Sequence, residues 1–188
     1  QYISGNFSFD TVSTLPNTTS LNLVTANQTG QQSGLSCNSA NCALAMDTTK
    51  MADGRYEVYL QANTSGKIIG NSERKYFYVV NKQPATMQLS FKGASGTNLQ
   101  SPLKGRVVFD VDATTSSVPF SSITFLVKQG GKIVLSKGAD MVLPQMTMGW
   151  RTPTVANGTY QISMEAVIQS NSATYKAVSN EITVTVQN

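Results

Sequence analysis

One phrase occurs twice in this chain, and it constrains the fold more than any other feature. Residues 46–62 read MDTTKMADGRYEVYLQA, and residues 150–166 read WRTPTVANGTYQISMEA. The two align without a gap at a constant offset of 104 (150 minus 46), which places Tyr56 on Tyr160. A repeat of that period is the size of a domain rather than of a solenoid unit. The sequence therefore predicts two tandem domains of the same fold.

Short segments in which apolar and polar residues alternate occur throughout the chain, whereas helical periodicity is almost absent. Alternation is the pattern of a strand with one buried face, and evenly spaced short strands predict an all-β sandwich. The expected strands are 5–11, 20–25, 55–62, 74–80, 86–91, 105–112, 122–128, 131–136, 158–167 and 181–187. Pro84 lacks a backbone donor and interrupts this series. We therefore expect one domain at 1–81 and a second at 82–188.

The two halves differ where they begin. ISGNFSFD at 3–10 aligns with LKGRVVFD at 103–110, at an offset of 100. The second half has the expected strand 86–91 ahead of this block, whereas the first half has only Gln1 and Tyr2. We expect the first domain to lack its first strand. Such a domain exposes a sheet edge that a neighbouring subunit can cover by strand addition.

Three segments of the second half extend the repeated phrase into a recognisable pattern: SITFLVKQGGKIV, GWRTPTVANGTY and SNEITVTV. They resemble the bacterial immunoglobulin-like modules of secreted polysaccharide-degrading enzymes and cell-surface proteins. The matching positions are Phe125, Trp150, Val155, Asn157, Gly158, Tyr160 and the segment 179–186; the first half keeps Asp47, Thr48, Thr49, Asp53, Gly54 and Tyr56 but has Met46 in place of the tryptophan. The resemblance implies two tandem immunoglobulin-like β-sandwich domains. It implies no single function, because such modules serve as spacers, adhesion units and fibre subunits.

The residues that carry most enzyme chemistry are missing or isolated. The chain contains no histidine, which excludes Ser-His-Asp and Cys-His catalysis. Asp110 and Asp112 lie two apart on one expected strand and are a weak Ca²⁺ candidate, but we favour a solvated strand face without metal. Trp150 is the single tryptophan and suits either a sugar-stacking platform or the core; we favour the core, because Met46 takes its place in the first domain. We predict no catalytic residue and no cofactor.

Cys37 and Cys42 are the only cysteines. Their C-x4-C spacing, without histidine or a second pair, argues against zinc and is not that of a redox C-x-x-C motif. We predict a local disulfide, which is typical of an extracellular chain. Its expected role is to pin a long polar loop, residues 26–45, against the sandwich, where a loop of that length offers a contact surface.

Five asparagines begin N-x-S/T sequences: Asn6, Asn17, Asn27, Asn63 and Asn157. They are candidate glycosylation sites, and four of the five lie in the first domain. A chain this rich in Asn, Ser and Thr also produces such sequences by chance. Asn157 belongs to the repeated turn phrase and therefore counts for little.

Hydropathy, the first residue and the net charge restrict the possible partners and location of the protein. No apolar run approaches the roughly 20 residues that a membrane helix needs. The chain opens on Gln1, which we interpret as the start of a mature chain after removal of a signal peptide. The net charge of +4 rests on scattered groups, without an Arg/Lys cluster between stacking aromatics, so we expect no nucleic-acid partner.

These observations predict a non-catalytic extracellular structural protein. Our first expectation is a subunit of a cell-surface filament, pilus or layer that self-associates through sheet edges and interdomain contacts. The alternative is a carbohydrate-binding, spacer or adhesion module of a larger secreted hydrolase or adhesin, with polysaccharide as its partner. The sequence alone does not decide between the two.

Overall fold

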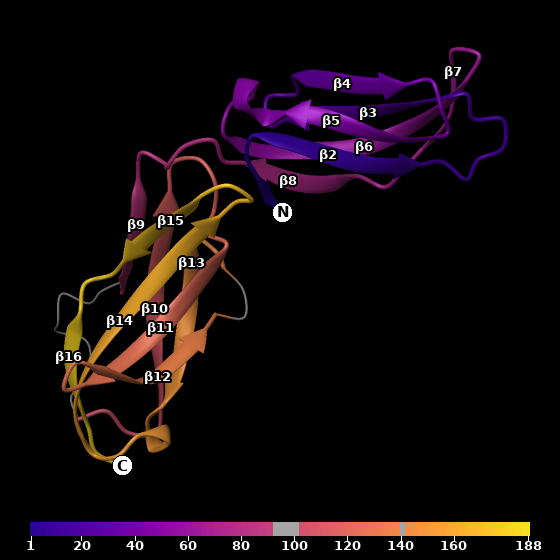
Figure 1. Ribbon diagram of the computed structural model, residues 1–188. Coiled ribbons are helices and arrows are strands. Elements are labelled where there is room, and N and C mark those ends of the chain that lie inside the picture. The colour runs from indigo at the N-terminus through magenta and orange to yellow at the C-terminus, as the bar shows by residue number, and fades with distance from the viewer. Residues whose placement is uncertain (92–101, 140–141) are drawn as a thin grey trace. The chain divides into compact units, whose positions relative to one another are not determined.

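A computed structural model describes residues 1–91, 102–139 and 142–188, and these residues are built almost entirely from β-strands (Figure 1). The chain divides into two compact units. Unit 1 comprises Gln1–Gln83 with Ser170–Ala173, and unit 2 comprises Pro84–Gln169 with Thr174–Asn188. Within the described ranges there is no helix with the length and apolar character that crossing a membrane requires.

Unit 1 is a sandwich of two sheets. Its larger sheet has the strand order β1-β8-β6-β3-β4, with β7 paired to β6, and its smaller sheet consists of β2 and β5. The strands are β1 (Tyr2–Ile3), β2 (Asn6–Val12), β3 (Ser20–Asn27), β4 (Gln32–Cys37), β5 (Asn41–Asp47), β6 (Gly54–Thr64), β7 (Lys67–Asn71) and β8 (Lys75–Val79). The core lies between the sheets and centres on Ile3, Met46, Tyr56, Phe77 and Val79.

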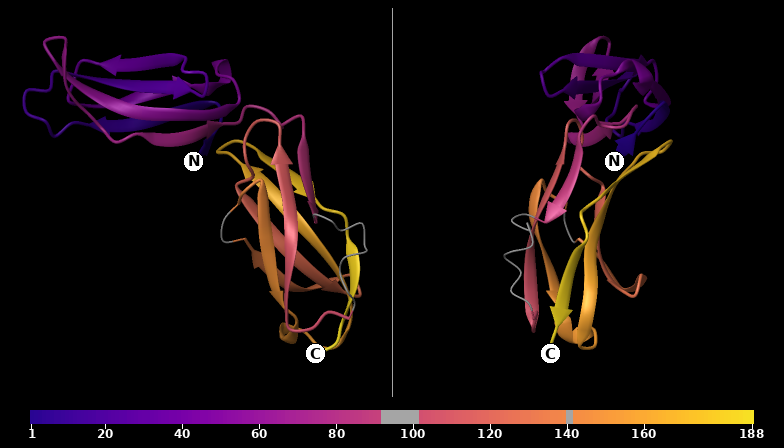
Figure 2. Two further views of the ribbon diagram at one scale, coloured as in Figure 1. Left: turned by 180° about the vertical axis from the view of Figure 1, so that it is seen from behind. Right: turned by 90° about the vertical axis from the view of Figure 1, so that its left-hand side faces the viewer.

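Unit 2 repeats this plan, and Figure 2 shows its strands stacked in two layers. One sheet has the order β12-β11-β14-β15, with β16 paired to β14, and the other has the order β13-β10-β9. The strands are β9 (Met87–Phe91), β10 (Arg106–Thr115), β11 (Ser122–Gln129), β12 (Lys132–Gly138), β13 (Gln145–Arg151), β14 (Gly158–Gln169), β15 (Thr174–Val178) and β16 (Ile182–Val186).

The repeated phrase forms the same strand–turn–strand connection in both units. It runs from β5 through the 3-10 turn η1 (Thr48–Lys50) into β6, and from β13 through η2 (Thr152–Thr154) into β14. The Tyr56 hydroxyl donates a hydrogen bond to the Ala52 carbonyl at 3.0 Å, and the Tyr160 hydroxyl donates to the Ala156 carbonyl at 2.8 Å. Each tyrosine therefore fixes the backbone that leads into its own strand, as the tyrosine-corner pattern predicts.

An asparagine closes this turn in each unit. The side-chain amide of Asn81 donates to the carbonyls of Thr48 (2.7 Å) and Met51 (3.1 Å). Asn188 donates in the same way to Thr152 (3.2 Å) and Val155 (2.9 Å). The backbone N–H of Asn81 also donates to the Asp53 carboxylate at 2.8 Å, and that of Asn188 to the Asn157 amide oxygen at 2.7 Å. The Asp and Asn of the repeated phrase thus have a structural role.

The prediction of a long polar loop at residues 26–45 was wrong. Most of this segment is strand, because β4 spans Gln32–Cys37 and β5 begins at Asn41. Residues of β5 alternate between the core and solvent, and Leu44 and Met46 are buried. A short connection between the two strands replaces the long polar loop, so the disulfide described below joins strands rather than pinning a loop.

Candidate functional site

The outer face of the larger sheet in unit 1 carries a group of tyrosines and arginines. Successive residues of a strand point to opposite faces. The side chains of Tyr56 and Phe77 are buried in the core, so their neighbours on β6 and β8 point outward. We call this outer group the tyrosine–arginine face; it consists of Tyr2, Arg55, Glu57, Tyr59, Arg74, Tyr76 and Tyr78.

Contacts within the tyrosine–arginine face hold its side chains in place. The Arg55 guanidinium lies over the Tyr76 ring, 3.8 Å from its centroid. Arg74 lies 5.1 Å from the Tyr59 ring centroid, and its guanidinium forms an ion pair with the Glu57 carboxylate. Cation–π contacts of this kind contribute about 0.5–1 kcal/mol at exposed sites. The planar groups are therefore partly ordered before any ligand arrives.

A stacked pair forms the end of the face at β1. The rings of Tyr2 and Tyr78 stack with their centroids 5.0 Å apart and an interplanar angle of 22°. Burial, and secondarily the neighbouring Tyr78, raises the pKa of Tyr2 to about 12 from its ordinary value of 10.0. The shift therefore changes the ionisation of Tyr2 only at alkaline pH, where its phenol stays neutral longer than an ordinary one.

A shallow hollow lies on the same face. Its volume is about 270 Å³, and it is lined by Ala26, Asn27, Gln28, Arg55, Glu57 and Tyr76. Asn27 is held by its own turn, because its side-chain oxygen accepts from the backbone N–H groups of Thr29 (3.1 Å) and Gln31 (2.9 Å). The hollow thus combines an exposed tyrosine ring with charged and amide groups that make hydrogen bonds.

The aligned positions of unit 2, all within the described residues, hold no aromatic side chain. The β6 positions of Arg55, Glu57 and Tyr59 correspond, through the repeated phrase, to Thr159, Gln161 and Ser163. Through the strand registers, the β8 positions of Tyr76 and Tyr78 correspond to Thr183 and Thr185. The tyrosine–arginine face is therefore a feature of one unit on a scaffold that both units share.

Trp150 lies in the core, as favoured from the sequence. Its side chain is 2% exposed and contacts the rings of Phe125 and Tyr160. Met46, its counterpart in unit 1, is buried as well. The Trp150 indole N–H has no hydrogen-bond partner among the described residues, and nothing in the structure explains why. A buried ring cannot act as a sugar-stacking platform.

Asp110 and Asp112 lie on the same face of β10, as their spacing predicts. Asp110 is exposed and pairs in register with Thr147, and Asp112 is half-buried opposite Gln145. Within the described ranges, no group of three or more His, Cys, Asp or Glu side chains surrounds a common point. The pair thus offers a cation two carboxylates without a further acidic ligand.

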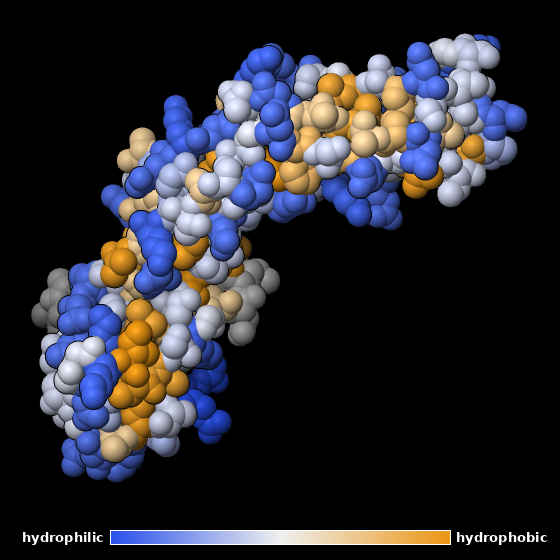
Figure 3. Space-filling view, in the orientation of Figure 1, coloured by the Kyte–Doolittle hydropathy of each residue, from blue (hydrophilic) through white to orange (hydrophobic). Residues whose placement is uncertain are grey.

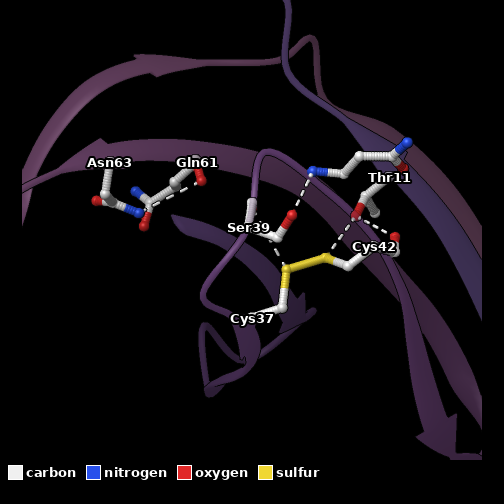
Figure 4. Close-up of a disulfide and its surroundings, with 7 residues drawn as sticks. Thr11, Cys37, Ser39, Cys42, Gln61 and Asn63 are labelled. Atoms are coloured by element: carbon white, nitrogen blue, oxygen red, sulfur yellow. Dashed lines mark hydrogen bonds between the residues drawn. A yellow bond between two sulfur atoms is a disulfide. The ribbon is translucent and has the colours of Figure 1, made fainter. Parts of the chain in front are cut away.

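Cys37 and Cys42 form a disulfide that joins β4 to β5, with their Cα atoms 6.7 Å apart (Figure 4). β4 is the edge of the larger sheet and β5 belongs to the smaller sheet, so the bond ties the two layers together. The Thr11 hydroxyl on β2 donates to the Cys42 carbonyl at 2.7 Å. The disulfide is therefore built into the sandwich and does not border the tyrosine–arginine face.

The asparagines of the N-x-S/T sequences differ in exposure. Asn6, Asn17 and Asn157 are exposed, and Asn27 is half-buried. Asn63 is only 5% exposed, and its amide donates to the Gln61 carbonyl at 3.4 Å (Figure 4). The structure thus argues against Asn63 as a glycosylation site, because a buried amide is not open to modification. Glycosylation at the other four stays a prediction.

The sequence interpretation missed the tyrosine–arginine face. The signal was present in two segments, RYEVY at 55–59 and RKYFY at 74–78, where aromatic or charged residues occupy every second position. Alternation shows that these residues share a face within one strand. It does not show that the two strands are neighbours, which requires the register of β6 with β8.

No protein-family model and no curated protein matches the chain. Among solved structures, it is similar to the FN1–FN3 domains of chicken CNTN1, with a TM-score of 0.53 and 10% identity, covering 100% of this chain and 64% of that one. It also aligns with the fibronectin(III)-like modules of Clostridium thermocellum CbhA at 18% identity and a TM-score of 0.38, covering 98% and 86% of the two chains. A two-domain fibronectin type III segment of chicken tenascin aligns at 10% identity and a TM-score of 0.35, covering 94% and 92%.

The similarity to the CNTN1 domains bears on the fold alone. It confirms the prediction of an all-β chain built from tandem immunoglobulin-like β-sandwiches. The particular bacterial class that the sequence resembles stays a prediction. Fold does not determine function, so the role of this chain is argued from its surfaces.

Proposed function

We propose that this chain is a non-catalytic extracellular module that binds polysaccharide through the tyrosine–arginine face and belongs to a larger secreted hydrolase or adhesin. The observation that carries the proposal is the asymmetry between the units. Four tyrosines and two arginines gather on one outer sheet face of unit 1, where the aligned positions of unit 2 on β14 and β16 are Thr, Gln and Ser. Because both units share this scaffold, the scaffold itself does not require tyrosine or arginine at these outward positions.

The chemistry of the face suits a sugar chain. A tyrosine offers a flat apolar ring and a polar tip, which matches the apolar faces and the hydroxyl edges of a pyranose ring. Arg55, Glu57 and Asn27 line the hollow beside Tyr76 and provide donors and acceptors for hydroxyl groups. Arg74 and Glu57 compensate each other, which leaves Arg55 over the Tyr76 ring as the net positive charge of the face.

Two further observations support an extracellular, non-catalytic role. The disulfide between Cys37 and Cys42 is typical of oxidising compartments. The repeated tyrosines, Tyr56 and Tyr160, and the turn residues Asp53 and Asn157 all make structural hydrogen bonds. These side chains of the repeated phrase are thereby committed to the fold.

Retention on insoluble polysaccharides tests the proposal. The chain should bind at least one member of a panel of cellulose, xylan, chitin and mannan, and Tyr76→Ala should weaken that binding about five- to tenfold through loss of a stacking ring. Tyr175→Ala is the matched control, because it removes a tyrosine from β15 of unit 2. Equal binding by both variants would contradict the assignment of the face.

A subunit of a surface filament or layer is the second candidate function. One observation favours it: the outer edge of β2 in unit 1 has no partner strand among the described residues. An open edge is a template for pairing with another chain. Sedimentation of the purified chain decides this candidate, since a filament subunit forms large polymers whereas a module remains dispersed.

A further inference from the structure

The smaller sheets of the two units have different numbers of strands. β10 of unit 2 lies between β13 and β9, whereas its counterpart β2 pairs only with β5. The structure describes every residue from 1 to 83, and none of them pairs with the outer edge of β2. Unit 1 therefore has an open strand position that unit 2 fills.

Unit 2 shows what such a position accepts. β9 runs antiparallel to β10, with Phe91 opposite Val111 and Leu89 opposite Ala113. Leu89 and Phe91 are buried, and the Phe91 ring contacts the Phe109 ring at a centroid distance of 5.5 Å. An uncharged strand with bulky apolar side chains at alternate positions thus closes the core of unit 2.

A groove lies at the equivalent place in unit 1. Its volume is about 620 Å³, and its core-facing lining includes Phe9, Thr11, Leu23, Val58, Leu60 and Phe77. The aligned positions of unit 2 are Phe109, Val111, Phe125, Ile162, Met164 and Val184, and each is at most 3% exposed. In unit 1, Phe9, Val58 and Leu60 are only half-buried. Figure 3 shows apolar residues exposed among polar ones on the side of unit 1 that carries β2 and β5.

The backbone of β2 presents hydrogen-bonding groups to this groove. The Ser13 N–H donates to the Ala40 carbonyl at 2.8 Å, on the side of β5. Because peptide groups alternate in direction along an antiparallel strand, the Val12 N–H points to the open edge. Val12 itself is 63% exposed. We call the edge of β2 and the groove together the acceptor groove.

We propose that the acceptor groove binds a β-strand donated by a partner protein. The donated segment is extended, runs antiparallel to β2 and has two bulky apolar side chains at alternate positions, as β9 does. Among the described residues of a second copy, the strand of this kind, β9, is already paired and buried in unit 2 and would have to be released first, so we assign the groove to a partner protein. The proposal does not depend on polysaccharide binding, since it rests on a backbone edge and on core-facing positions.

A labelled peptide with the sequence of residues 84–91, PATMQLSF, is the probe. It should bind the full chain, as measured by fluorescence anisotropy, and should slow hydrogen exchange of the Val12 amide. A control peptide with Leu89→Ser and Phe91→Ser should not bind. Val12→Pro removes the N–H at the open edge and should weaken binding about tenfold, whereas Val12→Thr keeps the N–H and should bind like the unaltered chain. Circular dichroism establishes that both variants fold.

Three results would overturn the proposal. The first is equal binding of the two peptides, which would show that the apolar side chains of the peptide do not contribute to binding. The second is protection of β4 amides instead of Val12, which would place the acceptor edge elsewhere. The third is a dimer in sedimentation that Val12→Pro abolishes without added peptide, because the occupant would then be a second copy of this chain. A chain that failed to bind polysaccharide would still give a clear result in each of these three measurements. Failure of the proposed function and failure of this proposal are therefore distinguishable.

Discussion

At the scale of single residues, tyrosine has two uses in this chain. Tyr56 and Tyr160 point inward, are buried, and donate to carbonyls of their own turns. Tyr59, Tyr76 and the stacked Tyr2 and Tyr78 lie on the outer face of unit 1. The position of each tyrosine along its strand decides which use it has, because alternate side chains face opposite sides of a sheet.

Tyr2 should ionise later than an ordinary tyrosine, because burial raises its pKa to about 12. Its contribution to stability is fully present below the unfolded-state pKa of 10.0 and is lost as the pH rises from there to about 12. The measurement is a phenolate absorbance titration of the chain and of Tyr2→Phe. The difference between the two curves is the titration of Tyr2 alone. Its midpoint should lie near pH 12 in the folded chain and near the ordinary tyrosine pKa of 10.0 in denaturant. A difference centred on the ordinary value in the folded chain would contradict the stated burial.

The sequence could predict those residues whose role is repeated within the chain. Tyr56 and Tyr160 follow the same turn phrase, and the replacement of Trp150 by Met46 indicated a core position. Asn63 shows the limit, because its N-x-S/T sequence contains no information about the buried position it takes in β6. The grouping of Tyr59 with Tyr76 depended in the same way on a long-range strand register.

At the scale of elements, the strands with one continuous buried face were predictable. β4 and β7 were not, because their residues are exposed or half-buried and show no clear alternation of apolar and polar types. β15 alternates from Thr174 to Ala177 but is short and was not predicted. β5 and β13 do alternate, with Met46 and Trp150 buried at their ends. The interpretation of 26–45 as a loop concealed β5, although Leu44 and Met46 carried the signal.

The disulfide links elements of different sheets, so its removal should weaken the contact between β4 and β5. Replacing both cysteines, Cys37→Ser with Cys42→Ser, should cost about 2 kcal/mol of unfolding free energy, as expected for a closed loop of about six residues. Chemical denaturation with hydrogen exchange at β4 and β5 is the measurement. The matched control is the unaltered chain with and without a reductant, which should reproduce the loss. Unchanged stability in both comparisons would show that strand pairing alone holds the two sheets.

At the scale of the whole molecule, duplication supplies matched controls. Tyr56→Phe and Tyr160→Phe remove the same hydrogen bond from two copies of one turn. Each should destabilise its own unit by about 1 kcal/mol, because the carbonyl it served loses its partner. Hydrogen exchange of the β6 amides for Tyr56→Phe and of the β14 amides for Tyr160→Phe reads out the two effects. A loss in one unit only would show that the repeated turn does not have the same importance in both.

The parallel pairing of β1 with β8 has a mechanical consequence. Unit 1 is entered at β1 and left at β8, and the two run in the same direction, joined by bonds from Tyr78 N–H to the Gln1 carbonyl and from Val80 N–H to the Ile3 carbonyl. Tension applied across the unit pulls parallel neighbours in opposite directions along their axes. The bonds are then loaded together in shear and do not open one after another. Within unit 1, the two-residue strand β1 would thus be held against stretching by bonds that must break together.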